Sequence, residues 1–128
     1  MNNMEAIIKN VRLVDDVLNY NSNIVGTYSP IVQKIKEKTA AYTVLSSDVG
    51  VYLRINSAAS VNVTIEDFTC EIGGCISFEQ AGAGVITLVA SGVTLNSLDG
   101  GLKSMGQYAV MQIIKTGEST FTVIGSTT

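Results

Sequence analysis

The 128-residue chain carries eight basic and eleven acidic residues, and its net charge of −3 gives no electrostatic reason to expect a nucleic-acid partner. It is long enough for one domain with its own hydrophobic core. Only 15% of the residues are charged and 46% are hydrophobic, so we expect part of the surface to be buried against copies of the chain or another protein. The apolar runs are too short to cross a membrane and the start lacks a secretory signal, which predicts synthesis in a cytoplasm without membrane insertion.

The first twenty residues have the spacing of an amphipathic helix. Their apolar residues recur at intervals of three and four, which places them on one stripe of a helix. The stripe consists of Met4, Ile7, Val11, Val14 and Leu18. Two heptads do not hold a coiled coil alone, so the segment needs a partner, either its own domain, sister chains or a docking surface. We predict that residues 1–30 form an oligomerisation or docking segment that ends in the polar connector Asn19 to Pro30.

Residues 31–128 read as a β domain. The stretch from Ile31 to Lys36 is expected to be an edge strand whose lysines discourage further pairing. After it, short alternating runs such as Val51 to Asn56 recur with Gly, Ser and Asn turns between them. Val85 to Val89 is apolar on nearly both faces, which predicts a central strand. This pattern favours an all-β fold, an antiparallel β-sandwich or a jelly-roll-like domain.

The two cysteines, Cys70 and Cys75, flank four residues that include Gly73 and Gly74. The chain has no histidine and no second thiol pair, so a metal site is disfavoured, and the spacing is longer than that of redox motifs. Geometry allows a disulfide across the turn, but a reducing compartment opposes it. We therefore expect two free thiols that fill apolar space.

Catalytic and ligand-binding motifs find little support. The carboxylates near turns are Glu66, Asp67, Glu71, Glu79 and Asp99, and no feature selects a catalytic pair among them. A calcium site in the 66–71 loop lacks the dense oxygen spacing of a dedicated loop. Residues 81–84 precede a strand without a Lys-Ser/Thr pair, so a tight turn explains their glycines better than a phosphate cradle does. We expect no enzyme activity, no metal and no cofactor.

A set of Gly, Ser, Thr and Val patterns between about residue 40 and residue 126 resembles a β module common in tailed-bacteriophage virion proteins. The matching segments are Tyr42–Val44, Leu53–Ser57, Val61–Ile65, Ile76–Leu88, Ser91–Ser97, Gly106–Val110 and Phe121–Gly125. Two positions depart from the pattern. Phe121 stands where relatives tend to carry Trp, and Glu66-Asp67-Phe68 stands where they often have Pro. Modules of this kind occur in tail fibres, tail spikes, head fibres and capsid decoration proteins, usually as homotrimers.

The resemblance implies a non-enzymatic structural protein of the virion, a homotrimeric head fibre or capsid decoration protein held by the major capsid or another virion protein. A short chain that starts at its own methionine fits this better than a long tail fibre. The alternative is a receptor- or glycan-binding module of a tail fibre or spike, which would contact a host cell-surface glycan. Its candidate contacts are Tyr52, Arg54 and Tyr108, although the two tyrosines could instead cover a core edge or a subunit interface.

Overall fold

The computed structural model describes residues 32–128, which form nine strands, two short 3-10 helices and no α-helix. The predicted helical stripe of Met4, Ile7, Val11, Val14 and Leu18 lies outside the described residues. The 3-10 helices span Ser46–Asp48 and Leu98–Gly100. The strands are β2 (Lys34–Lys38), β3 (Tyr42–Thr43), β4 (Val51–Ile55), β5 (Val61–Glu66), β6 (Cys75–Gln80), β7 (Ile86–Ser91), β8 (Thr94–Ser97), β9 (Val110–Gly117) and β10 (Thr120–Gly125). The all-β prediction is confirmed.

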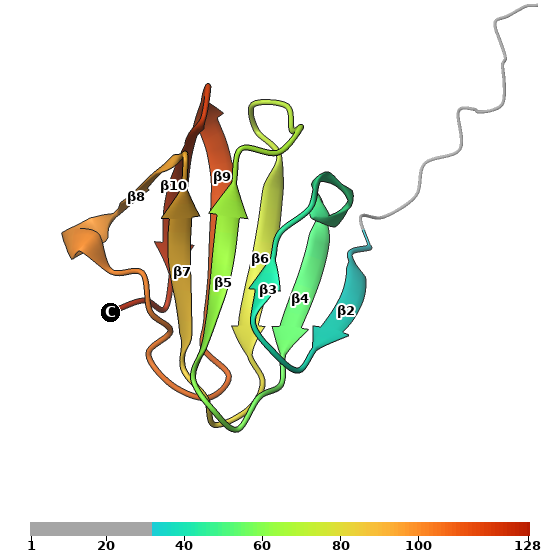
Figure 1. Cartoon of the computed structure of the whole chain (residues 1–128), viewed down its shortest axis with the longest axis vertical. Coiled ribbons are helices and arrows are strands. Elements are labelled where there is room, and N and C mark those ends of the chain that lie inside the picture. Colours follow the sequence, from blue (N-terminus) through green and yellow to red (C-terminus); the bar gives the residue numbers. More distant parts are fainter. Residues whose placement is uncertain (1–31) are drawn as a thin grey trace, which may run out of the picture. The chain divides into compact units, whose positions relative to one another are not determined.

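The chain winds as a β-solenoid (Figure 1). There is a six-stranded sheet of order β2-β4-β6-β9-β10-β8 and a three-stranded sheet of order β3-β5-β7. Successive strands from β2 to β7 alternate between the two sheets, while β8, β9 and β10 all belong to the six-stranded one. Strands β2, β4 and β6 pair in parallel in the first sheet, and β3, β5 and β7 do so in the second. Each of the pairs β2–β3, β4–β5 and β6–β7 is therefore one coil, and the three coils stack along one axis.

The predicted antiparallel sandwich or jelly roll is wrong. Only β9 forms antiparallel strand pairs, with β6 and β10, while the other pairings between the described strands are parallel. Alternation of apolar and polar residues has a period of two in either pairing, so it does not distinguish them. Gly and Ser turns likewise mark a change of direction without showing whether the next strand pairs with the previous one.

The hydrophobic core lies between the two sheets, and its side chains stack from coil to coil. Leu53 is in register with Phe78, which is in register with Met111, and all three are fully buried. On the second sheet, Val63 is in register with Leu88. Stacking like residues in successive coils removes each apolar side chain from water on several sides, which is the main source of stability in this fold.

Strand β7 corrects the prediction of a fully covered central strand. Ile86 and Leu88 are buried, but Thr87 and Val89 are half-buried on the outer face of the sheet. β7 is the last strand of its sheet, and its free side is covered by a short segment that contains Leu102. The backbone N–H of Leu88 donates to the carbonyl oxygen of Leu102 over 2.8 Å.

The two ends of the stack are built differently. The far end is closed by β9, β10 and β8, and the final residue exchanges backbone hydrogen bonds with Lys103. At the near end, Lys34, Lys36 and Lys38 of β2 are in register with the core residues Val51, Leu53 and Ile55 of β4. Lysines therefore occupy the core-facing positions of the edge strand, which confirms the predicted edge. Charges at these positions oppose the addition of another strand.

Candidate binding surface on the β-solenoid

Two of the three predicted glycan contacts lie together on the outer face of the six-stranded sheet. Tyr52 and Arg54 occupy alternate positions of β4, and both contact Glu79 on β6. The Tyr52 hydroxyl and the Arg54 Nε each donate a hydrogen bond of 3.0 Å to the Glu79 Oε1. The Arg54 hydrogen bond is the main reason why the pKa of Glu79 lies below its ordinary value. Burial, followed by the hydrogen bond to Glu79, raises the pKa of Tyr52.

This cluster continues into a row of alternating charge. Glu37, Arg54 and Glu79 are in register across β2, β4 and β6, so each carboxylate flanks the guanidinium. The Asn56 Nδ2 also donates a hydrogen bond of 2.9 Å to the Glu37 Oε2. These mutual contacts stabilise the sheet and engage both carboxylates of the row, while the terminal guanidinium nitrogens of Arg54 make no hydrogen bond within the described residues.

Tyr108 lies elsewhere, in the loop that leads into β9, and no hydrogen bond of the described residues joins it to Tyr52 or Arg54. Its side chain is 65% exposed. Its backbone has φ of +71°, a left-handed conformation that costs a bulky residue about 1 kcal/mol or more. An exposed ring on strained backbone points to function rather than to packing.

Tyr108 lies on one of the two sides of the solenoid where loops connect the strands. The loops on this side contain no charged residue. The parallel winding places the connections β2–β3, β4–β5 and β6–β7 at the same end, and the loop before β9 joins them there (Figure 1). We call this surface the uncharged end, and it is made of residues 39–41, 56–60, 81–85 and 104–109. These loops consist of alanine, glycine, serine and a few larger uncharged residues. The loops at the opposite end contain Asp67, Glu71 and Glu118.

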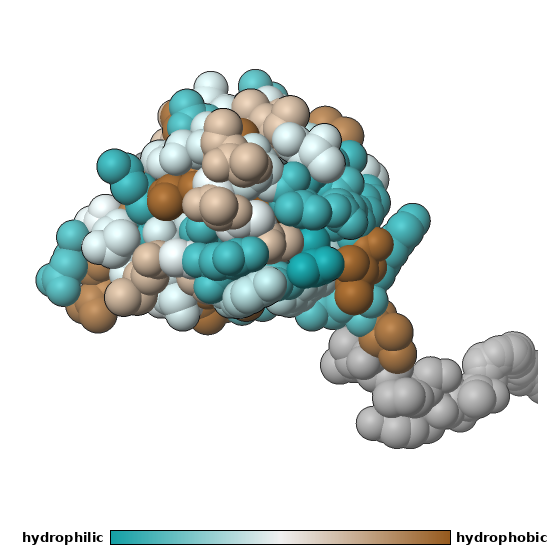
Figure 2. Space-filling view, turned by 90° about the horizontal axis from the view of Figure 1, so that it is seen from below, coloured by the Kyte–Doolittle hydropathy of each residue, from teal (hydrophilic) through white to brown (hydrophobic). Residues whose placement is uncertain are grey.

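Figure 2 is seen from the side on which the uncharged end lies, and it shows light-brown apolar residues next to teal polar ones. Small side chains lose little conformational entropy when a partner covers them. These four loops contribute no charged side chain that a partner would have to desolvate, and the nearest charges along the chain are those of Lys38 and Lys103, which precede two of the loops. The uncharged end is therefore suited to an uncharged partner.

A buried amide holds the uncharged end in shape. Gln80 is 1% exposed, and its Nε2 donates to the carbonyl oxygens of Gly82 (3.1 Å) and Ala83 (3.2 Å). The Ser104 hydroxyl donates to the Gln80 Oε1 over 2.6 Å and accepts from the backbone N–H of Ile86 over 2.9 Å. A satisfied buried network of this kind fixes the loops in one arrangement.

The same glutamine also positions Tyr108. The backbone N–H of Tyr108 donates to the carbonyl oxygen of Gln80 over 2.6 Å. Next to it, the Gln107 Nε2 donates to the carbonyl oxygen of Ala81 over 3.1 Å. Sequence reasoning noted Gln107 only as the polar neighbour of Tyr108 and missed Gln80 and Ser104, because a lone polar residue in a strand or loop carries no signal of its buried partner.

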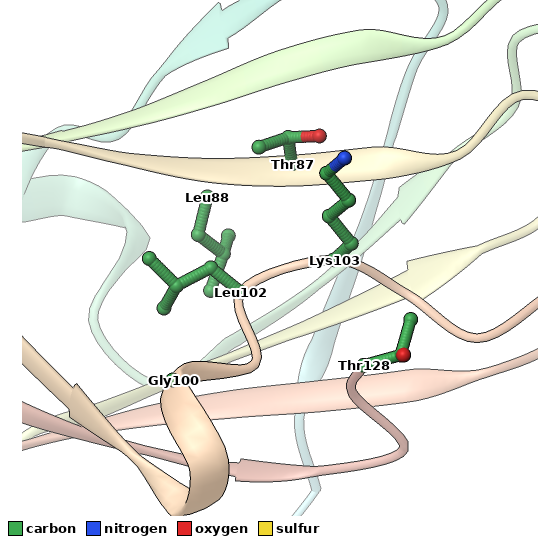
Figure 3. A pocket seen from close by; sticks show the side chains of 6 residues that line it. All are labelled: Thr87, Leu88, Gly100, Leu102, Lys103 and Thr128. Atoms are coloured by element: carbon green, nitrogen blue, oxygen red, sulfur yellow. The ribbon is translucent and has the colours of Figure 1, made fainter.

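An open depression of about 560 Å³ lies beside β7 (Figure 3). It is lined by Thr87, Leu88, Gly100, Leu102, Lys103 and Thr128. Lys103 is the one charged side chain among them, and it projects beside Thr87. The lining brings together no acid, base and nucleophile, so we assign it no chemistry.

Within residues 32–128, no group of three or more His, Cys, Asp or Glu is placed to hold a metal ion. Asp67 accepts a hydrogen bond of 3.0 Å from the Ser119 hydroxyl, and Glu79 belongs to the ion pair with Arg54. No helix in the described part of the chain is long and apolar enough to span a membrane.

Comparisons of the chain with models of protein families, with characterised proteins and with solved structures gave no significant match.

Substitutions of Tyr108 distinguish the energetic cost of its backbone conformation from the contribution of its ring. Glycine adopts positive φ without cost, so we expect Tyr108→Gly to raise the free energy of unfolding by about 1 kcal/mol, measured by urea denaturation. Tyr108→Ala keeps the strain and removes the ring, and it serves as the matched control. A loss of stability in Tyr108→Gly would mean that the ring contributes packing, which would contradict its assignment as an exposed contact residue.

Proposed function

We propose that this chain is a non-enzymatic structural protein of a bacteriophage virion, a homotrimeric head fibre or capsid decoration protein that projects from the particle. The observation that carries the proposal is the winding of residues 34–128. Short coils stack in parallel with a continuous core, and antiparallel strands close one end. Such a stack is stiff along its axis and has no hinge between two bodies, which suits a projecting scaffold.

The exposed apolar side chains support self-association. Large hydrophobic residues that are well exposed include Ile35, Leu45, Ile72, Leu98, Met105 and Ile124. A closed symmetric trimer would bury part of this surface, and an interface of about 800 Å² per chain is enough for a stable complex. In this proposal the predicted stripe in residues 1–30 docks the trimer on the major capsid protein or another virion protein. The protein is made in the host cytoplasm and resides in the virion.

The mass of the purified protein tests the proposed trimer, and its location on the particle tests the proposed role in the virion. We expect light scattering of the purified chain at micromolar concentration to give three times the mass of the 13.5 kDa subunit. Electron microscopy of intact particles labelled with antibody should place the protein on the head. A stable monomer would contradict the trimer, and label confined to the tail would contradict the head assignment. Absence of label from particles would contradict the virion assignment itself.

The second candidate is a receptor-binding module of a tail fibre or spike, and Tyr108 is the observation that favours it. An exposed aromatic face beside hydroxyl and amide groups is the usual surface for a sugar ring, and the buried Gln80 network holds this one rigid. Because the uncharged end has no ions, binding to a neutral host glycan should be independent of salt concentration.

A glycan array followed by titration tests this candidate. If the uncharged end binds the glycan, Tyr108→Gly should abolish micromolar binding, while Tyr52→Ala should leave it intact because the Tyr52 hydroxyl is already bonded to Glu79. The reverse result would place the glycan on the outer face of the six-stranded sheet. If no glycan binds, the receptor-binding candidate is contradicted and only the structural function remains.

A further inference from the structure

The two cysteines lie on either side of a tight turn. The backbone N–H of Gly74 donates to the carbonyl oxygen of Glu71 over 2.9 Å, which closes a four-residue β-turn from 71 to 74. Gly73 has φ of +96°, as the third residue of a type II turn requires. Residues that flank such a turn face one another, and a disulfide needs Cα atoms about 4.4–6.8 Å apart. Both thiols are free, as predicted, and each cysteine is half-buried.

The sulfur of Cys70 lies against Gly74, the residue before Cys75, and its S–H donates a hydrogen bond of 3.3 Å to the carbonyl oxygen of Glu71. A Cβ built on Gly74 would lie 2.4 Å from the Cys70 Sγ, so this sulfur packs directly on the residue that precedes Cys75. Any residue larger than glycine at position 74 would displace this sulfur. The glycine therefore lets the sulfur of Cys70 lie against the residue next to Cys75 in the chain.

The two halves of the loop are held unequally. On the Cys75 side, Gly73 and Gly74 exchange backbone hydrogen bonds with Lys115, over 2.7 Å and 2.9 Å, and Cys75 itself pairs with β9. On the Cys70 side, Phe68 stacks on Phe121 with 5.6 Å between the ring centroids. A covalent link between the cysteines would tether the segment 66–70 to the part of the turn that β9 already fixes.

A cation lies near the thiols. The side chain of Lys115 is 9% exposed, and its Nζ lies 6.0 Å from the centroid of the Phe121 ring. Burial raises the pKa of the Cys70 thiol, and the Lys115 ammonium acts in the opposite direction. The thiol therefore stays protonated at neutral pH, while the ammonium supports the small thiolate fraction that reacts with an oxidant.

We propose that Cys70 and Cys75 are a modification site, a reversible disulfide that closes over the 71–74 turn when the protein meets a thiol oxidant such as glutathione disulfide. The Cys70 thiolate attacks one sulfur of the oxidant and releases one glutathione thiolate. The Cys75 thiolate then attacks the mixed disulfide at the Cys70 sulfur and releases the second. Two cysteine thiols are oxidised, one glutathione disulfide is reduced to two glutathione molecules, and the two protons pass to the released thiolates. This inference is independent of the proposed function.

Intact mass of the full chain in a glutathione buffer tests the proposal. We expect the oxidised protein to be lighter by about 2 Da, the two hydrogen atoms lost, at any protein concentration in the micromolar range. Dithiothreitol should restore the original mass. Unchanged mass, a stable glutathione adduct or a disulfide-linked dimer would each overturn the proposal.

Limited proteolysis gives a second readout. Cleavage within residues 66–75 should slow about tenfold on oxidation of the wild-type chain, since the tether restricts local opening. The variants Cys70→Ser and Cys75→Ser should show no such change, and their circular dichroism reports whether they fold. Equal cleavage rates before and after the mass change would show that the bond does not restrain the loop, and would overturn its role as a tether.

Discussion

Gly84→Ala is expected to lower the free energy of unfolding by about 3 kcal/mol, the largest effect of a single methyl group in the described part of the chain. A Cβ at this position would lie 1.9 Å from the carbonyl oxygen of Ala59 and 2.3 Å from its carbonyl carbon. Both atoms belong to the backbone, so the clash is relieved only by separating the loops of two neighbouring coils. The Gly84 N–H also donates to the carbonyl oxygen of Ser57 over 2.8 Å, and separation would break this bond.

Gly106→Ala is the matched control for that prediction. Gly106 lies in another loop of the uncharged end, its φ is not in the left-handed region, and a Cβ there meets no atom within 4 Å. We expect its free energy of unfolding, measured by urea denaturation, to change by less than about 0.5 kcal/mol. Equal effects of the two substitutions would contradict the close packing of residues 57–59 against 81–84.

Asp48→Ala is expected to cost about 3 kcal/mol of stability. The carboxylate is fully buried beside β2, the first strand of the stack, and it accepts three hydrogen bonds. Its donors are the Lys36 Nζ (2.9 Å), the Tyr42 hydroxyl (2.6 Å) and the backbone N–H of Leu45 (2.9 Å). Removing it leaves these donors without their acceptor. It also removes the counter-charge of a lysine that occupies a core-facing position of β2.

The same cluster gives stability a defined dependence on pH. Burial by itself raises the pKa of Asp48, but the hydrogen bonds from Tyr42, Leu45 and Lys36 outweigh it and hold the pKa below its usual 3.8. A lowered pKa in the folded state means that this stabilisation is complete above pH 3.8 and is lost as the pH falls through the lower, folded value. For Tyr42, burial and then the hydrogen bond to Asp48 raise the pKa to about 12. Its contribution is complete below pH 10 and is lost as the pH approaches 12.

Urea denaturation at several pH values checks these expectations. The difference in unfolding free energy between the wild type and Asp48→Asn should shrink as the pH falls below 3.8, because the wild-type carboxylate becomes protonated. A constant difference for Asp48→Asn between pH 7 and pH 3 would contradict the ionised, hydrogen-bonded state of Asp48.

The sequence by itself determined which face of each strand is buried and which strand forms the edge. Val51, Leu53 and Ile55 are inward in the structure because alternation in a strand fixes the side on which a residue points. Lys34 and Lys36 marked an edge because a charge is tolerated at a core-facing position only where the core ends.

Only the tertiary structure decided the direction of pairing and the composition of the candidate site. The parallel stack brings Arg54 to Glu79, 25 residues away in the sequence, and Gln80 to Ser104, 24 residues away. Coils of unequal length leave no regular repeat from which these partners could be predicted. Tyr108 was selected from the sequence as an aromatic residue beside a polar one. Its strained backbone and its separation from Tyr52 depend on the position of the loop before β9, which the sequence did not show. Local pattern determines the orientation of a side chain, whereas its neighbours depend on how distant segments stack.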